Sequence, residues 1–303
     1  MTNKFLIIEV DREAPESLEE MGSKKKFWFS RYESKRRRYL YKEARQNTGE
    51  DWAEKIASEL CKLLNLPHAD YELATFNNQY GIISPSFLPE NGSLVLGNEI
   101  LAPMVPNYPK TESFKVSQHT MENIFVALTQ DFVNLPLQWT PPNGITTAAE
   151  AFVGYLLLDA WIGNSDRHHE NWAFIHFRKK TYLAPTYDHA SSMGREMLDN
   201  KRFLKLKNES VTSYAQKCTS AIYGSVEDIK PLKTFDVFCK AQERYPKAAS
   251  VWLHNLANVS TDDTLELFRR IPSERISETA IEFAQKILEL NQRRLLNLRE
   301  DVL

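Results

Sequence analysis

The amino-acid sequence predicts an α+β protein with two lobes, a small β-rich N-terminal lobe and a larger, mainly helical C-terminal lobe. Short aromatic and β-branched runs bounded by turn residues crowd the first hundred residues, whereas segments with helical periodicity fill most of the rest. A proline-rich stretch over residues 84–110 separates the two regions and is expected to be loop, with a hinge near residues 84–90. We therefore expect one lobe over residues 1–105 and the other over residues 106–303.

The N-terminal lobe is expected to be a small sheet with one inserted helix. The strand-like runs are residues 4–10, 27–31, 38–43, 71–76 and 80–84. Between the third and fourth runs, apolar residues recur from Ala53 to Leu64 at the spacing of a helix, and Pro67 limits the helix at its C-terminal end.

The C-terminal lobe is expected to be helical over residues 120–133, 147–163 and several segments between 227 and 300. Two strand-like stretches, residues 172–177 and 181–187, interrupt the helices. The first of them follows a long apolar helix, AFVGYLLLDAWI, and the polar segment after it.

The bulk composition excludes several classes of protein. The 303 residues carry a net charge of −2, which gives no electrostatic basis for direct binding to nucleic acid. Three scattered cysteines form neither a disulfide scaffold nor a zinc spacing. The short apolar start does not fit a signal peptide, and no apolar run reaches the length of a membrane span. We expect a cytoplasmic protein without membrane contact.

The strongest chemical signal is the polar segment GNSDRHHEN, which contains Asp166 and Asn171 and lies between the apolar helix and the following strand. A second acid, Asp188, follows the next strand. Phosphoryl transfer needs one carboxylate for the proton of the attacking hydroxyl, and further oxygens that hold Mg²⁺ against the nucleotide phosphates. Asp166 suits the first role, and Asn171 and Asp188 suit the second. The alternative is a solvated polar loop, which the position of Asp188 disfavours.

The D-R-H-x-x-N pattern that begins at Asp166 resembles the catalytic loop of HipA-like kinases and of phosphatidylinositol 3/4-kinases. The segment Tyr187-Asp188-His189-Ala190-Ser191 is similar to the Y-D-x-x-S form of HipA-like proteins, where the lipid kinases carry an Asp-Phe-Gly-like triplet. The resemblance covers roughly residues 20–200. It implies a protein-kinase-like fold, ATP and Mg²⁺ as cofactors, and transfer to serine or threonine of a protein substrate.

A kinase also needs a strand lysine on the nucleotide phosphates and a helix glutamate that orients this lysine. Lys42 lies in a strand-like run, and Glu54 opens the following helix, where Glu59 is a competing candidate. ATP is expected between the lobes near residues 84–88, with Ser84 and Phe87 beside it. The phosphate loop that the resemblance implies comprises Gly22, Ser23, Lys24 and Lys25.

The resemblance further implies autophosphorylation at a serine near this loop, with Ser17, Ser23 and Ser30 as candidates. It also implies an antitoxin-like regulator as a partner and a toxin or secreted effector as the biological context. Longer family members carry an extra N-terminal subdomain, so this chain is expected to be a short form. A lipid or small-molecule kinase of the same fold, and a catalytically silent binding module, stay open as alternatives.

Four other features receive structural interpretations. Arg167 is expected to order its loop by pairing with a nearby acid. Trp161 and Trp172 are expected to pack in the core. His168 and His169 lack a third ligand at a zinc spacing. The basic run over residues 35–38 is expected to be a solvated hairpin tip.

Overall fold

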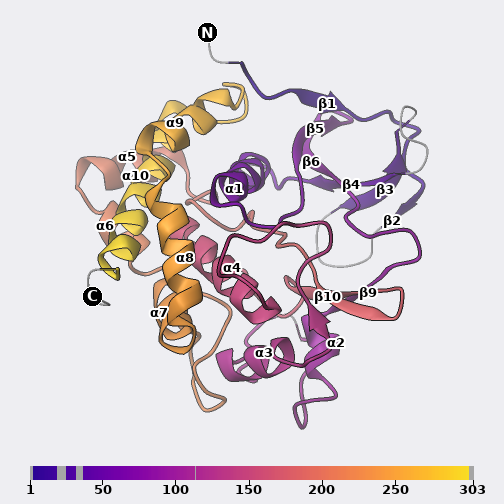
Figure 1. The fold of residues 1–303 in the computed structure, drawn as a ribbon. Coiled ribbons are helices and arrows are strands. Elements are labelled where there is room, and N and C mark those ends of the chain that lie inside the picture. The colour runs from indigo at the N-terminus through magenta and orange to yellow at the C-terminus, as the bar shows by residue number, and fades with distance from the viewer. Residues whose placement is uncertain (1–2, 19–24, 32–36, 113, 300–303) are drawn as a thin grey trace.

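The computed structural model describes residues 3–18, 25–31, 37–112 and 114–299, and these form a β-rich lobe beside a mainly helical one (Figure 1). The two-lobed α+β prediction is confirmed. None of the described helices is both long and apolar enough to cross a bilayer.

The first sheet holds six strands in the order β1-β5-β6-β4-β3-β2. Its strands are β1 (Ile7–Glu9), β2 (Ser17–Leu18), β3 (Lys26–Ser30), β4 (Arg38–Glu43), β5 (Glu72–Phe76) and β6 (Gln79–Pro85). β1 pairs parallel with β5, and the other neighbours are antiparallel. The predicted strand runs are all present, although β1 covers only three residues of the first run.

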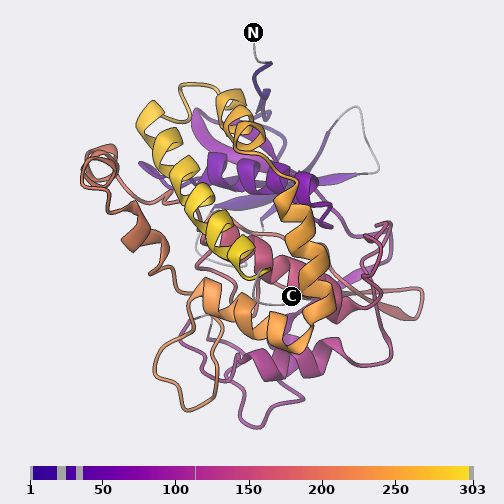
Figure 2. The same cartoon turned by 60° about the vertical axis from the view of Figure 1, so that its left-hand side comes forward.

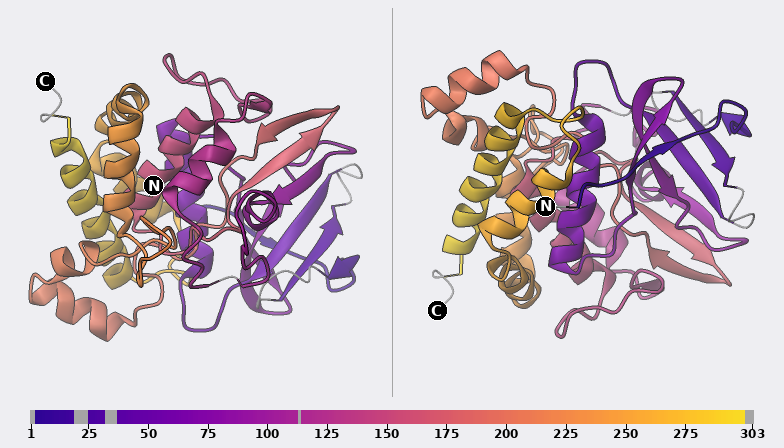
Figure 3. Two further views of the ribbon diagram at one scale, coloured as in Figure 1. Left: turned by 90° about the horizontal axis from the view of Figure 1, so that it is seen from below. Right: turned by 90° about the horizontal axis from the view of Figure 1, so that it is seen from above.

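Strand β4 places its side chains alternately on the two faces of this sheet. Tyr41 lies in an aromatic cluster, with its ring centroid 5.0 Å from that of Phe27 and 5.5 Å from that of Phe76. The next residue, Lys42, therefore points to the opposite face, where it is buried. On this face lies α1 (Glu50–Leu64), which packs between the sheet and the C-terminal helices (Figure 3).

A second sheet has the order β7-β9-β10-β8. It consists of β7 (Ser93–Leu96), β8 (Val133–Asn134), β9 (Ala173–Phe177) and β10 (Lys180–Leu183). The prediction of loop throughout residues 84–110 is therefore wrong at β7 and at the short helix α2 (Gly97–Leu101). β7 forms because it pairs with β9, far along the chain, and no local pattern reveals such a partner. β10 is shorter than predicted and stops before Pro185, which has no backbone N–H to donate.

The helical lobe is arranged around α4 (Ala148–Ile162), whose side chains are almost all buried. The other helices are α3 (Met121–Leu128), α5 (Asp199–Lys207), α6 (Val211–Ala215), α7 (Thr234–Arg244), α8 (Pro246–Ala257), α9 (Thr261–Arg270) and α10 (Glu278–Asn297). α7, α8 and α10 pack directly on α4 (Figure 2).

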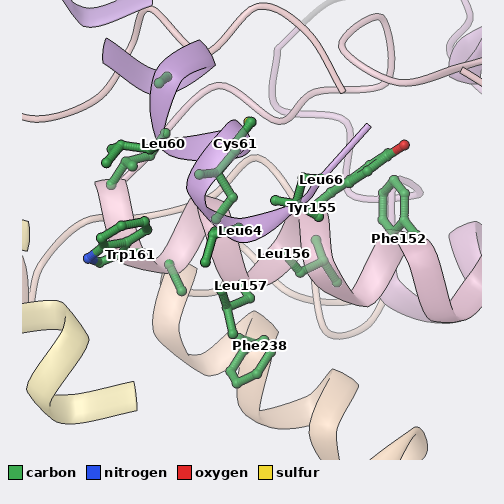
Figure 4. Close-up of a cluster of buried hydrophobic side chains, with 14 of the residues drawn as sticks. Leu60, Cys61, Leu64, Leu66, Phe152, Tyr155, Leu156, Leu157, Trp161 and Phe238 are labelled. Carbon is green, nitrogen blue, oxygen red and sulfur yellow. The ribbon is translucent and has the colours of Figure 1, made fainter. Parts of the chain in front are cut away.

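One continuous apolar core joins α1 to the helical lobe. Leu60 and Leu64 of α1 face Leu157 and Trp161 of α4, and Phe238 of α7 packs from below (Figure 4). Because α1 shares this core, it is held against the helical lobe even though its sequence belongs to the N-terminal one. The predicted burial of Trp161 is confirmed, at 0% exposure.

A buried ion pair also connects the two lobes. Arg275, in the segment between α9 and α10, donates from Nη1 to Asp51 Oδ2 at 2.8 Å, and the two side chains are 1% and 2% exposed. Its Nη2 donates to the carbonyl oxygen of Ala74 at 2.9 Å and to Thr75 Oγ1 at 2.8 Å. The start of α1 and the strand β5 are thereby fixed to the C-terminal helices.

Candidate active site

The loop that follows α4 carries two of the predicted catalytic residues. Gly163 caps the C-terminal end of α4 with a φ of 67°, a left-handed conformation that glycine adopts without strain. Asn171 Nδ2 donates to the backbone carbonyl of Asp166 at 2.6 Å, so each of these two residues holds the other in place. The Asp166 side chain is 30% exposed, and Ser191 Oγ donates to its Oδ2 at 3.4 Å.

Arg167 orders this loop from inside the protein, as the sequence predicted. Its guanidinium, with a side chain 0% exposed, donates to both carboxylate oxygens of Asp159 in α4, at 2.7 and 2.8 Å. It also donates to the carbonyl of Asn171 at 2.7 Å and to Thr186 Oγ1 at 3.1 Å. One buried cation therefore connects α4, the Asp166 loop and the segment that leads to Asp188.

Asp188 has a φ of 57°, an unusual conformation for a residue with a side chain. Its backbone N–H donates to Tyr71 Oη at 3.2 Å, and its carboxylate forms a short ion pair with Lys42. Burial alone would lower the pKa of Lys42, but the Asp188 and Glu54 carboxylates raise it above its ordinary value. Lys42 is therefore charged, and it connects the N-terminal sheet to the Asp188 segment.

Glu54 is fully buried and acts on the same segment through the backbone. Its carboxylate accepts hydrogen bonds from the N–H groups of His189 at 2.7 Å and Ala190 at 3.0 Å. Among the described residues, no ion pair joins Glu54 to Lys42, which differs from the expected direct contact. Glu59, the competing candidate, is instead paired with Lys55 and Lys62, each at 2.8 Å.

The predicted nucleotide-binding residues lie at the junction of the two sheets. Ser84 is the residue before the last one of β6, the strand that pairs with β4, and is 8% exposed. Phe87 stacks on Tyr187, with ring centroids 5.8 Å apart, and belongs to the apolar clusters of both sheets. Of the predicted phosphate loop, only Lys25 is described, and its carbonyl accepts from Glu43 N at 3.0 Å. Gly22, Ser23 and Lys24 lie outside the described residues.

The two histidines of the loop take structural positions. His169 Nδ1 hydrogen-bonds Tyr108 Oη at 2.8 Å, and burial lowers the pKa of His169 to about 4, so the ring is neutral at pH 7. His168 Nε2 lies 3.8 Å from Asp166 Oδ1. Trp172 is 2% exposed and donates from Nε1 to His119 Nε2 at 3.1 Å, which confirms its predicted core position.

Sequence reasoning missed four residues that build this site. Asp159 neutralises the charge of Arg167. Tyr71 Oη accepts a hydrogen bond from the backbone N–H of Asp188. Thr186 Oγ1 contacts Nε2 of His189 at 2.7 Å. Asp159 had a detectable signal, because a single acid inside the apolar run AFVGYLLLDAWI must find a partner when it is buried. Tyr71 had none, since its partner Asp188 is distant in sequence. Thr186 and His189 are only three residues apart, but no local pattern indicates that their side chains meet.

Comparison with known proteins agrees with this geometry. In the structure of a proinflammatory kinase, CtkA of Helicobacter pylori, the same fold extends over 98% of this chain and 99% of that chain, with a TM-score of 0.72 and 18% sequence identity. The HipA chain of a toxin–antitoxin complex with HipB and operator DNA from Shewanella oneidensis gives a TM-score of 0.54 at 12% identity, over 95% of this chain and 66% of that one. The fold is therefore of the kinase type.

The sequence profile of the HipA-like C-terminal domain matches residues 17–229, more than half of the chain. The chain belongs to this family. No curated protein sequence matches it. Family and fold together support a kinase.

Proposed function

We propose that this protein is an ATP-dependent serine/threonine protein kinase that transfers the γ-phosphoryl group of ATP to a protein hydroxyl. One observation carries the proposal. The Lys42–Asp188 ion pair joins the N-terminal sheet to the segment facing the Asp166–Asn171 loop, so that a cation, two acids and an amide converge between the lobes. Phosphoryl transfer depends mainly on such positioning and on charge neutralisation.

Each polar group has a distinct role in this proposal. Lys42 binds the nucleotide phosphates, and Glu54 positions Asp188 by holding the two amides that follow it. Asp166 accepts the proton of the attacking hydroxyl. ATP lies between the lobes beside Ser84 and Phe87, with Gly22, Ser23, Lys24 and Lys25 over its phosphates.

The residues present fit a magnesium ion. The Asn171 amide nitrogen is engaged by the Asp166 carbonyl, so its amide oxygen is the group oriented as a ligand. Asp188 adds a carboxylate that is 27% exposed. Carboxylate and amide oxygens are ligands that Mg²⁺ prefers. Bound Mg²⁺ would neutralise phosphate charge during transfer.

The test is incubation of the purified protein with γ-labelled ATP and Mg²⁺, alone and with cell extract. We expect label in the protein fraction with the wild type and none with Asp166→Ala or Asp188→Ala. Asp131→Ala, which removes an exposed acid, is the matched control. Retained activity in either active-site variant would contradict the roles assigned here.

The same experiment separates the alternatives. Label that partitions into an organic extract or a small-molecule fraction would indicate a lipid or small-molecule kinase. A thermal shift with ATP but no ATP consumption would indicate a binding module without turnover.

Autophosphorylation and a protein regulator belong to the same proposal. Of the candidate serines, Ser17 Oγ accepts from Arg38 Nη2 at 2.8 Å, a contact that would suit a phosphoserine. Ser30 lies at the end of β3, and Ser23 is outside the described residues. Phosphosite mapping distinguishes the three.

The HipA protein compared above is in complex with HipB, which supports an antitoxin-like regulator here, and affinity capture from the cytoplasm of the source cell would test it.

A further inference from the structure

A cavity of about 380 Å³ lies beside the candidate catalytic loop. Three segments line it: residues 165–169 of the loop itself, residues 114–119, and residues 220–231. Figure 1 shows the last two segments within loops at the lower edge of the helical lobe, before α3 and α7. None of the roles proposed above uses this cavity.

Hydrogen bonds connect the loops that form the walls of the cavity. His119 Nδ1 hydrogen-bonds the carbonyl of Ala221 at 2.9 Å, and Tyr223 N donates to the carbonyl of His119 at 3.0 Å. His119 Nε2 in turn accepts from Trp172, the residue directly after Asn171. The two loops are therefore fixed to each other and to the catalytic loop, which gives the cavity a defined shape.

The lining is mostly apolar and contains no acidic residue. Phe114, Val116, Tyr223 and Pro231 supply apolar surface, and Lys115 is the one lysine or arginine among the lining residues. Phe114 stands at the cavity with 68% of its surface exposed and its ring edge-on to His168, 5.7 Å between centroids. An exposed aromatic ring at a hollow with apolar walls offers surface that a bound apolar side chain would remove from water.

Further exposed apolar side chains lie on the same loop as the cavity wall. Ile229 is 93% exposed and Val226 47% exposed. This loop also supplies the lining residues Tyr223 and Pro231, and Phe114 adds exposed apolar surface at the cavity itself. A polypeptide that carries an apolar side chain would bury this surface, whereas a basic peptide would find no acid among the lining residues.

The cavity lies within reach of a peptide whose hydroxyl is at Asp166. Ser165 and His168, on either side of Asp166 in sequence, both line the cavity, and consecutive Cα atoms are about 3.8 Å apart. An extended peptide spans about 3.3 Å per residue. A side chain roughly two to four residues from the acceptor hydroxyl would therefore reach the cavity.

We infer that this cavity binds an apolar side chain of the substrate protein, a few residues from the acceptor serine or threonine, and so selects the sequence that is phosphorylated. The inference rests on the proposed function, and it names the substrate class as a protein segment with an apolar anchor near the hydroxyl.

The first test measures binding and needs no turnover. A peptide library with one fixed serine and randomised flanking positions is selected on the wild-type protein, and dissociation constants are measured by fluorescence anisotropy. We expect enrichment of Leu, Ile, Met or Phe at one flanking position. Phe114→Ala should weaken binding of the selected peptide on the order of tenfold, since part of an apolar contact is lost, and Ala221→Trp should weaken it further by filling the cavity.

Two controls locate the effect. Phe203→Ala removes a phenylalanine of α5 that is 57% exposed, and it should leave binding unchanged. Replacing the anchor residue of the peptide with Ala should have little added effect in Phe114→Ala, because both changes remove the same contact. Thermal unfolding and ATP binding of Phe114→Ala should match the wild type.

The outcomes separate this inference from the proposed function. Absence of any apolar preference, or unchanged binding in both Phe114→Ala and Ala221→Trp, would overturn the cavity assignment even if label is transferred to protein. Selective binding of peptides, with no label transferred to any peptide or protein, would refute the kinase proposal. Label transferred to protein but never to the selected peptides would refute only the assignment of this cavity to substrate selection.

Discussion

Replacing Arg167 with methionine should destabilise the protein and stop phosphoryl transfer, because this side chain holds the site together from within. Methionine is long enough to occupy much of the buried volume but carries no charge and donates no hydrogen bond. The change leaves Asp159 buried, at 5% side-chain exposure, without its cation. It also removes the donor to the Asn171 carbonyl.

The magnitude follows from these contacts. Removing one partner of a buried ion pair costs about 3–5 kcal/mol. Asn164 Nδ2 continues to donate to Asp159 Oδ1 at 2.8 Å, so the carboxylate keeps one hydrogen bond and the lower part of that range is expected. Loss of the bond to Asn171 should additionally displace the amide of a proposed metal ligand, and activity should fall even where the protein stays folded.

The assay is guanidinium chloride denaturation of the wild type, Arg167→Met, Asp159→Leu and the double variant. Replacing both members of a buried pair with apolar residues is often close to neutral, so the double variant should recover most of the lost stability. It should still lack transfer activity. Arg167→Lys keeps the charge without the planar fork and should be intermediate. A loss below about 1 kcal/mol in Arg167→Met, or additive losses in the double variant, would refute the reasoning.

Three further variants test separate parts of the structure. Lys42→Met should lower the transfer rate roughly 10²–10³-fold, the usual effect of deleting a charged group that stabilises a transition state, as measured by initial rates at saturating ATP; near-normal rates would contradict its role. Burial lowers the pKa of His119 to about 3, so the unfolded chain takes up a proton below pH 6.5 that the folded chain does not. The free energy of unfolding should therefore fall by about 1.4 kcal/mol per pH unit on acidification. In His119→Gln this contribution between pH 6.5 and 5 should vanish, and an unchanged pH dependence would contradict the assigned role of His119. In Gly97→Ala the added Cβ would lie 2.4 Å from the Trp172 ring and 2.5 Å from the His169 carbonyl oxygen. We expect the free energy of unfolding to fall by roughly 1–3 kcal/mol and phosphoryl transfer to slow. A variant with wild-type stability and rate would show that this contact can relax.

Local patterns in the sequence were sufficient for most of the secondary structure. The helical period over residues 51–64 and the alternating aromatic strands appear in the structure with shifts of a residue or two. β7 was missed because its only support is a partner in a distant strand. Pairing between remote strands depends on the whole fold, so a window of ten or fifteen residues contains no signal that predicts it.

In the candidate site, too, the local features were predictable from sequence and the contacts between remote segments were not. The spacing of Asp166 and Asn171 is local, and it correctly marked a loop whose two members hydrogen-bond each other. The geometry around Glu54 was not predictable, because a helix glutamate can equally hold a lysine side chain or the backbone of a remote segment. Only the folded chain shows that its carboxylate lies on the amides of His189 and Ala190.

The ion pair between Arg275 and Asp51 has a consequence for the size of the folding unit. The family profile ends at residue 229, whereas Arg275 lies beyond it and satisfies a carboxylate whose pKa burial would otherwise raise further. A fragment cut at the end of the matched region would leave this acid enclosed without its cation and would expose the face of α4 that α7, α8 and α10 cover. The region that the family profile matches is thus smaller than the unit that folds cooperatively. The last quarter of the chain helps to hold helix α1, and with it Glu54, in place.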